Sequence, residues 1–169
     1  MRNERFPLAL DPPQGSVVTI DDSMIQTAIQ ASRKSPRGRI ILPFHLSEQD
    51  PLQRMLNGLQ PGSYIQPHRH LSPPKSEPII ILRGSLLVFI FDSDGKVDER
   101  ITLVAGSSRI GVDIRPGEFH TFAALAADTV IFEVKPGPYE ALSDKDFASW
   151  APEEGTPEAS EYLRDLLAE

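Results

Sequence analysis

The chain has 169 residues, of which 40% are hydrophobic and 24% charged, and its formal net charge is −7 at pH 7. This length and composition are typical of one globular domain with a core of its own. The negative charge argues against nucleic-acid and anionic-membrane partners. The absence of cysteine excludes disulfides and thiolate metal sites. No apolar run is long enough for a signal peptide or a transmembrane span, so we expect a cytoplasmic protein.

The first 38 residues contain one predicted helix. Sixteen prolines favour short strands joined by turns over a helical bundle, because proline is excluded from helix interiors and central strands. Asp21 and Asp22 are good helix caps, and they precede an amphipathic stretch that predicts a helix over residues 23–33. A short strand is predicted before this helix, at residues 16–20.

From residue 39 onward the sequence is mainly β. Apolar runs bounded by Gly, Pro, Asn and Asp indicate strands. Residues 52–59 fit a helix or a strand, and we assign a strand because prolines flank them. Gly84 divides a long apolar run, and Asp92–Gly95 is a strong hairpin signal. Short strands at this spacing predict a sandwich or a small barrel, followed by a C-terminal helix. The predicted strands cover residues 39–45, 52–59, 63–70, 77–91, 96–104, 107–114, 119–125 and 129–135, and the helix covers 156–169.

Two of the four histidines, His68 and His70, lie one residue apart on a predicted strand. Side chains alternate along a strand, so both rings point to the same face, about 6.6 Å apart along it. Two such histidines alone would more often be polar residues at a rim. Glu77 at the start of the next strand, and His120 after a distant Pro-Gly turn, complete a mixed nitrogen and oxygen site. Such a site suits Fe, Mn, Zn, Ni or Co and leaves positions open for a substrate.

The spacing of these residues resembles the two sequence motifs of the cupin superfamily. The segment PGEFH (116–120) resembles the core of the second motif. The chain is more closely similar to the cupin-fold metalloprotein family WbuC, whose members occur in bacterial polysaccharide gene clusters. The residues that match the first motif are Gly62, His68, His70, Glu77 and Gly84. The stretches that carry the closer likeness are SPRGR (35–39), DPLQRMLNGLQPGSYIQPHRH (50–70), FEVKPGPY (132–139) and DKDFASWAPEEG (144–155).

The resemblance implies a mainly β cupin fold, a double-stranded β-helix or jelly-roll barrel, with a short N-terminal helix and a C-terminal helix. We expect a single domain, in which residues 1–38 pack on a barrel of residues 39–140 and residues 141–169 form a tail and helix. The resemblance also implies a small-molecule pocket and a divalent transition metal. Because such barrels often pair through edge strands, we expect a homodimer. The implied metal ligands are His68, His70, Glu77 and His120.

Seven further residues are candidates for lining the pocket. Tyr64 and Gln66 share the phase of the histidines on their predicted strand, although packing at the barrel mouth suits Tyr64 slightly better than ligand binding. His45 better fits a hydrogen-bonded strand-end residue, although the resembled family also has a histidine at this place. The complete set is Tyr64, Gln66, Arg54, Asn57, His45, Glu133 and Lys135.

The other four candidates lie on two predicted strands. One polar side chain of the strand over residues 52–59, Arg54 or Asn57, is expected to face a ligand, and a plain surface position is the alternative. Glu133 and Lys135 share one face of the last strand, where a solvated ion pair is the alternative. Arg83 is in phase with Glu77 and could instead pair with Glu133 inside the barrel.

Two classes of function remain open from the sequence. The first is an enzyme that acts on a sugar or sugar nucleotide in polysaccharide biosynthesis, by isomerisation, epimerisation or other metal-assisted chemistry. With Fe(II) the same site would permit dioxygenase chemistry, and Glu77 would be a general base if it does not bind the metal. The second is a non-catalytic cupin that binds metal or ligand as a sensor or carrier. A metal-free epimerase would remain active after chelation.

Overall fold

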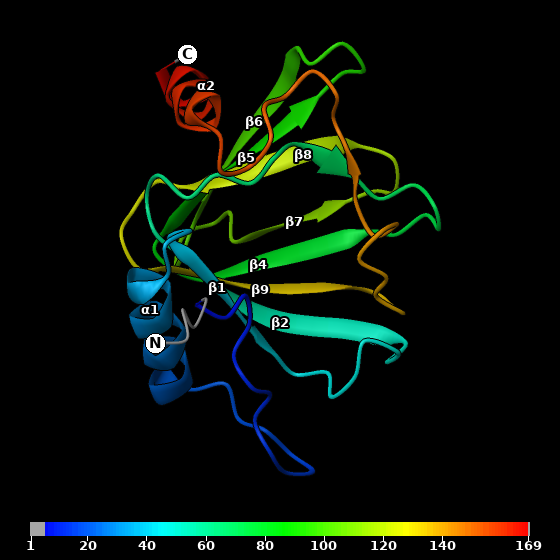
Figure 1. The fold of residues 1–169 in the computed structure, drawn as a ribbon. Coiled ribbons are helices and arrows are strands. Elements are labelled where there is room, and N and C mark those ends of the chain that lie inside the picture. Colours follow the sequence, from blue (N-terminus) through cyan, green and yellow to red (C-terminus); the bar gives the residue numbers. More distant parts are fainter. Residues whose placement is uncertain (1–5, 169) are drawn as a thin grey trace, which may run out of the picture.

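Two antiparallel sheets face each other, and two helices lie on the outside (Figure 1). The computed structural model describes residues 6–168. The elements are α1 Asp22–Lys34, β1 Arg39–Pro43, β2 Leu52–Leu59, β3 His68–Arg69, β4 Glu77–Arg83, β5 Ser85–Phe91, β6 Val97–Val104, β7 Gly111–Ile114, β8 Phe119–Ala124, β9 Thr129–Pro136, β10 Asp146–Phe147 and α2 Pro157–Ala168. One sheet has the order β1-β2-β9-β4-β7 and the other β10-β3-β8-β5-β6. The predicted mainly β fold is confirmed.

The main apolar core lies between the two sheets. Its side chains come from alternate positions of strands in both sheets, as expected for strands with one face buried. Neither helix in the described part of the chain has the length and apolar character needed to cross a membrane. The core residues are Leu59, Ile65, Ile79, Ile81, Leu86, Val88, Leu103, Ile114, Phe122, Ala124 and Ile131.

The helix α1 covers the outer face of the first sheet. It begins where the Asp21 side chain accepts a hydrogen bond from the Met24 backbone N–H at 3.0 Å. Its buried face, with Ile29, packs on residues of β1, β2 and β9. The helix comes very close to β2 at Gly58, where a Cβ atom would lie 2.6 Å from the carbonyl oxygen of Ala28. Only glycine fits this crossing.

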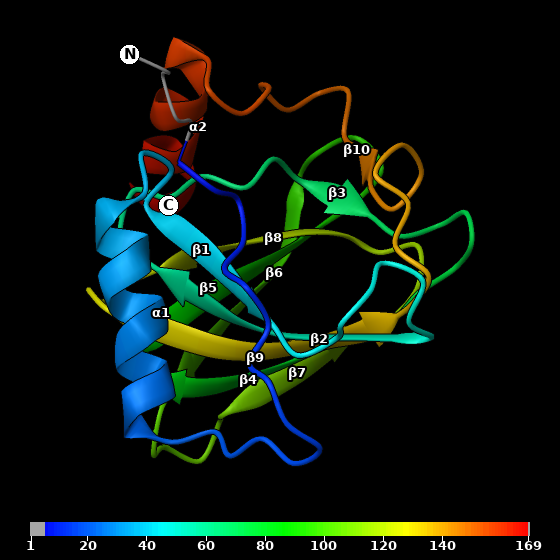
Figure 2. The same cartoon turned by 60° about the horizontal axis from the view of Figure 1, so that its bottom comes forward.

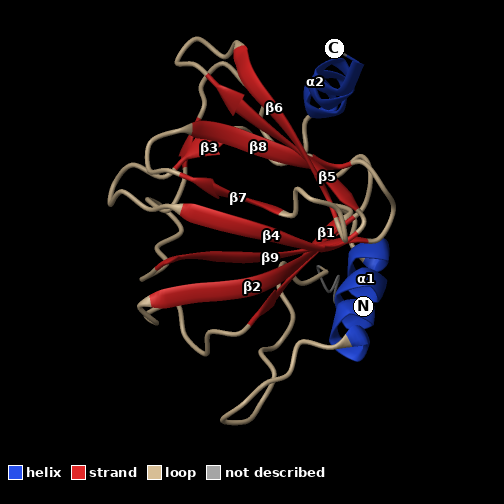
Figure 3. Ribbon diagram, turned by 180° about the vertical axis from the view of Figure 1, so that it is seen from behind, coloured by secondary structure: helices blue, strands red, loops and turns tan. Residues whose placement is uncertain are grey.

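The helix α2 covers the outer face of the second sheet (Figure 3). Leu163 and Leu166 on its buried face pack in one apolar cluster with Phe89 and Phe91 of β5. Figure 2 shows α1 at one end of the barrel and β3 with β10 toward the other. The two helices therefore leave the end near β3 to loops.

The structure differs from the sequence prediction at several local points, among them the strand predicted over residues 107–114, of which only Gly111–Ile114 forms β7. The strand predicted at residues 16–20 is wrong, because this segment has no β pairing and its Val17 is 85% exposed. The strand predicted over residues 63–70 is reduced to β3, since Pro67 has no N–H to pair and residues 63–67 run as irregular chain. The two-residue strand β10 was not predicted. It pairs with β3 and makes the edge of the second sheet.

Candidate metal centre

The four predicted ligands meet at the end of the barrel near β3. His68 on β3 pairs in register with His120 on β8, and His70 follows β3 directly. Glu77 is the first residue of β4, so the opposite sheet supplies the carboxylate. Candidate ligand atoms from the four side chains all lie within 4.8 Å of one another. Each of the four residues is at most 2% exposed.

Backbone carbonyls fix the same tautomer in all three histidines. His68 Nδ1 lies 2.9 Å from the Gln66 carbonyl oxygen, and His120 Nδ1 lies 2.9 Å from the Glu118 carbonyl oxygen. His70 Nδ1 contacts the Asp144 carbonyl oxygen. A carbonyl oxygen only accepts, so each Nδ1 carries the hydrogen and donates it. Each Nε2 is then left with a lone pair, as in histidines that bind metals.

The three Nε2 atoms converge and have no suitable protein donor. Among residues 6–168, His68 Nε2 and His120 Nε2 are buried without a hydrogen-bond partner. His70 Nε2 lies 2.7 Å from a Glu77 carboxylate oxygen. A lone pair and a carboxylate both accept, so this contact needs a proton or a metal cation between them. Three imidazole nitrogens and one carboxylate are a donor set that fits a divalent transition metal.

The electrostatics of the centre keep two of its candidate donors, His68 and Glu77, in the states that metal binding requires. Burial, reinforced by the positive charge of Lys145, holds the pKa of His68 well below its ordinary value. Burial alone would raise the pKa of Glu77, but its contacts with His120 and His70 and the positive charge of Lys135 outweigh burial and hold the pKa well below its ordinary value. The imidazole of His68 is therefore neutral and Glu77 is ionised at neutral pH, as metal ligands must be.

A second group of buried polar residues, on β2 and β9, lies next to the candidate metal ligands. Asn57 Nδ2 donates to Glu133 Oε2 at 2.7 Å, and Lys135 Nζ lies 3.9 Å from Glu133 Oε1. Burial, with the negative charge of Glu77, raises the pKa of Glu133 to about 7. Burial alone would lower the pKa of Lys135, but Glu133, Glu77 and Asp144 outweigh it and raise that pKa. Glu133 therefore changes its charge near neutral pH while Lys135 remains positive.

Asp144 joins this second group to the ligands. Its carboxylate accepts from Lys75 Nζ at 2.9 Å and from Lys135 Nζ at 2.8 Å, while its carbonyl holds His70. Sequence reasoning missed Lys75, Asp144 and the nearby Lys145. Two signals were available, because Lys75 lies in the loop between His70 and Glu77, and the other two lie in a stretch that carries the family likeness.

Two candidate pocket residues hold the C-terminal segment. Tyr64 is 6% exposed, donates through its hydroxyl to the Pro152 carbonyl at 2.8 Å and meets the Tyr162 ring edge-on. Burial raises its pKa. Gln66 donates to the carbonyls of Ala148 and Ala151 at 3.3 and 3.4 Å. Both side chains therefore link the segment that precedes β3 to residues 148–152.

The two polar candidates on β2 lie on opposite faces of the strand. Asn57 points into the barrel and is 8% exposed, whereas Arg54 is exposed and its guanidinium donates to the Phe44 carbonyl at 3.3 Å. His45 Nδ1 lies near the Arg54 backbone, at 3.2 Å from its N–H nitrogen and 3.0 Å from its carbonyl oxygen. The predicted pair of Arg83 with Glu133 is wrong, because Arg83 is exposed and Asn57 and Lys135 are the neighbours of Glu133.

Comparisons with known proteins support the fold. A family described as a domain of unknown function (DUF6016) matches residues 20–103. The comparison with curated proteins finds no match. Among solved structures, Cellulomonas parahominis L-ribose isomerase with L-psicose is similar with a TM-score of 0.52 and 18% identity, over 67% of this chain and 70% of that chain.

A second similar protein is CapF. Its structure with the inhibitor 3-isopropenyl-tropolone gives a TM-score of 0.50 and 23% identity, over 63% of this chain and 30% of that chain. The capsular polysaccharide assembling protein CapF from Staphylococcus aureus gives 0.47 and 22%, over 59% and 27%. This chain therefore spans less than a third of CapF. The neighbouring structures are cupin-fold proteins, and the predicted cupin fold is confirmed. The closer likeness to WbuC stays a prediction.

Proposed function

We propose that this protein is a metal-dependent cupin enzyme that binds a small sugar-like molecule and moves a proton within it, as in isomerisation or epimerisation. The observation that carries this function is the set of three histidine Nε2 lone pairs, fixed by carbonyls on Nδ1, that converge with Glu77 in a buried site. The sugar class is favoured by the resemblance to polysaccharide-cluster cupins and by the fold shared with L-ribose isomerase.

His68, His70, His120 and Glu77 would hold the metal. A bound divalent transition metal supplies Lewis-acid polarisation of a carbonyl or hydroxyl oxygen. The protein contributes orientation, because the carbonyl partners hold each imidazole in one tautomer and one direction. Burial of the ligands excludes water from the reacting oxygen, which strengthens electrostatic interactions there.

Glu133 is the residue that would move the proton. Its pKa of about 7 allows it to take and release a proton near neutral pH. Asn57 donates to Glu133 Oε2, and Oε1, which has Lys135 Nζ at 3.9 Å, would accept a proton from a substrate carbon and return it. Glu77 contacts two histidines and is assigned to metal binding, which leaves the role of general base to Glu133.

Metal loading and hydrogen exchange test this function together. Purified protein is analysed for transition metals, titrated with Mn, Fe, Co, Ni and Zn, and then incubated in D₂O with a panel of sugars and sugar nucleotides. We expect stoichiometric metal, and deuterium at one carbon of one substrate by NMR. A variant carrying His68→Ala and His70→Ala loses the metal, and His45→Ala, which changes a histidine outside the cluster, keeps it.

The outcomes separate the alternatives. Wild-type protein that neither contains nor takes up a stoichiometric metal contradicts the metal site. Tight sugar binding without deuterium incorporation or turnover favours a sensor or carrier. Turnover that consumes O₂ with Fe(II) favours a dioxygenase, and full activity after chelation favours a metal-free epimerase.

A further inference from the structure

Lys145 is a half-buried lysine that none of residues 6–168 engages in a hydrogen bond or ion pair. The two other lysines near the candidate metal ligands, Lys75 and Lys135, differ from Lys145 because both bind the carboxylate of Asp144. A half-buried ammonium without a hydrogen-bond or ion-pair partner loses part of its hydration with no direct contact to replace it. The unmatched charge of Lys145 is therefore the feature to explain.

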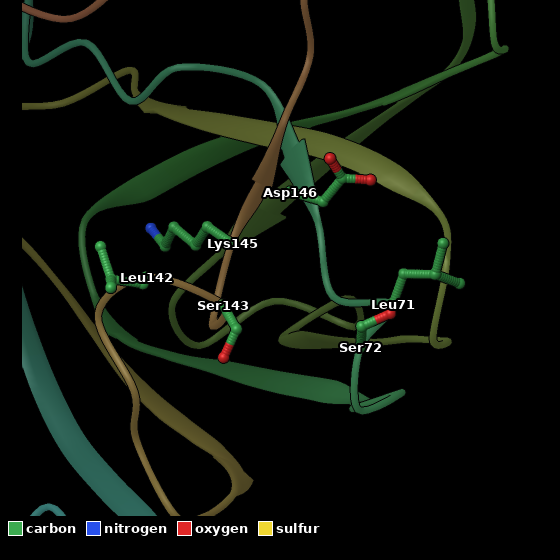
Figure 4. Close-up of a pocket in the computed structure, with 6 residues that line it drawn as sticks. All are labelled: Leu71, Ser72, Leu142, Ser143, Lys145 and Asp146. Atoms are coloured by element: carbon green, nitrogen blue, oxygen red, sulfur yellow. The ribbon is translucent and has the colours of Figure 1, made fainter.

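The side chain of Lys145 lies at a surface cavity next to the metal centre. Figure 4 shows its amine directed away from the carboxylate of Asp146. That carboxylate is already bound by Arg69 at 2.7 Å. The cavity has a volume of about 340 Å³, which is large enough for a small ligand. Its lining residues are Leu71, Ser72, Leu142, Ser143, Lys145 and Asp146.

Two connections place this cavity beside the metal ligands. Leu71 follows His70 in the chain, and β10 pairs with β3, so that Phe147 lies opposite His68. Electrostatic effects agree with this position. Burial lowers the pKa of Lys145, and the charge of Lys135 lowers it further, while Glu77 and Glu133 oppose the shift. The amine is thus within electrostatic reach of the carboxylate ligand and of Glu133.

The charges around the centre favour an anionic ligand. Three lysines, Lys75, Lys135 and Lys145, stand against three carboxylates, those of Glu77, Glu133 and Asp144. A divalent cation on the ligand set therefore gives the site an excess of positive charge, although the whole chain has a net charge of −7. Because Lys75 and Lys135 are paired, Lys145 is the cation of this set that can accept a new partner.

We propose that Lys145 binds a carboxylate or phosphate group of the substrate and so makes the site selective for an acidic or phosphorylated sugar over a neutral one. This assignment rests on the proposed function, since it places the anionic group beside the metal-bound part of the same molecule. The hydroxyls of Ser72 and Ser143 line the same cavity and supply neutral donors for the remaining oxygens of the anion.

Calorimetric titration of metal-loaded protein tests this anion-binding role of Lys145, the Lys145 anchor. The four probes are glucose, glucuronate, glucose 6-phosphate and inorganic phosphate. We expect glucuronate or glucose 6-phosphate to bind at least about tenfold more tightly than glucose, because charge-assisted hydrogen bonds are the stronger kind. Glucuronate and glucose 6-phosphate distinguish a carboxylate from a phosphate source, and inorganic phosphate reports the anion site without a sugar.

Three variants control the measurement. Lys145→Met is expected to weaken the preferred anionic probe about tenfold or more while glucose binding and metal affinity stay unchanged. Lys145→Arg keeps the charge and retains most of the preference. Lys96→Met changes an exposed lysine of the β5–β6 turn and leaves all four affinities as in the wild type.

Two results would overturn the anchor: equal affinity of the loaded wild type for all three sugar probes, or anionic probes that bind Lys145→Met as tightly as wild type. Metal uptake is measured on the same samples. Failure of uptake contradicts the proposed function, and Lys145-dependent phosphate binding to the metal-free protein would then still support the anchor.

Discussion

The two ends of the barrel interior differ in chemistry although the same strands build them. On β9 the inward side chain is Ile131 toward one end and Glu133 two residues further on. On β4 it is Ile79 and then Glu77. Strand geometry decides only which residues face inward, so a change of residue type along one face converts core into site.

At the polar end, several of the buried groups beside the histidines satisfy one another. Asn57 donates to Glu133, and Lys75 and Lys135 share Asp144. Buried ion pairs add little to folding stability, because desolvation offsets most of their attraction. The free energy of folding must therefore come from the apolar end and from the faces under the helices, while the polar end supplies the chemistry. This division predicts that a substitution at the apolar end lowers the free energy of unfolding and leaves metal affinity unchanged. A substitution at the polar end should lower metal affinity and have little effect on the free energy of unfolding.

The largest effect is expected at the apolar end. Leu86 on β5 is 0% exposed in the core between the sheets. Leu86→Ala leaves a cavity and should lower the free energy of unfolding by about 2–5 kcal/mol, measured by urea denaturation. Metal affinity, measured by calorimetry below the unfolding transition, should match the wild type. A large loss of metal affinity would show that the two ends are not independent.

The next effect is expected at the ligand carboxylate. Glu77→Gln removes the negative charge that faces the cation, and metal affinity should fall by about 100-fold or more, in line with the sensitivity of metal sites to their partners. The unfolding free energy of the metal-free protein should change little, because the loss of a charge whose low pKa favours the fold is offset by the new amide, which can donate to His70 Nε2. Unchanged metal affinity would remove Glu77 from the ligand set.

The strands and the clustering of His68, His70, Glu77 and His120 could be predicted because they follow from patterns in the sequence. Because side chains alternate along a strand, His68 and His70 were expected to point to the same face. Turn residues mark where β4 and β8 begin. The cupin motif spacing supplied the rest, including Glu77 and His120. The strand wrongly predicted at residues 16–20 had strand-like residues, but no neighbour covers it, and Val17 remains exposed.

Lys75, Asp144 and Lys145 could not be predicted, because they lie on loops. Alternation does not apply to a loop, so side-chain direction there depends on contacts between distant residues. The Asp144 carbonyl meets a histidine 74 residues earlier in the chain, and Lys75 reaches the same residue across 69 positions. Sequence therefore predicts what the strands contribute to the polar end and not the loop residues that neutralise it.

The smallest of the three effects concerns the pH dependence of Glu133. Its pKa of about 7 in the folded protein lies above the ordinary value of 4.5, so the neutral acid is the form that folding favours. The stability that this group contributes is complete below pH 4.5 and is lost as the pH rises through 7. In metal-free protein, Glu133→Gln should therefore unfold with the same free energy as wild type near pH 4.5. At pH 8 the variant should be more stable by on the order of 2 kcal/mol. The amide oxygen still accepts from Asn57, so a constant offset between the two curves from pH 4.5 to 8 would mean that Glu133 does not titrate in this window and cannot act as the base.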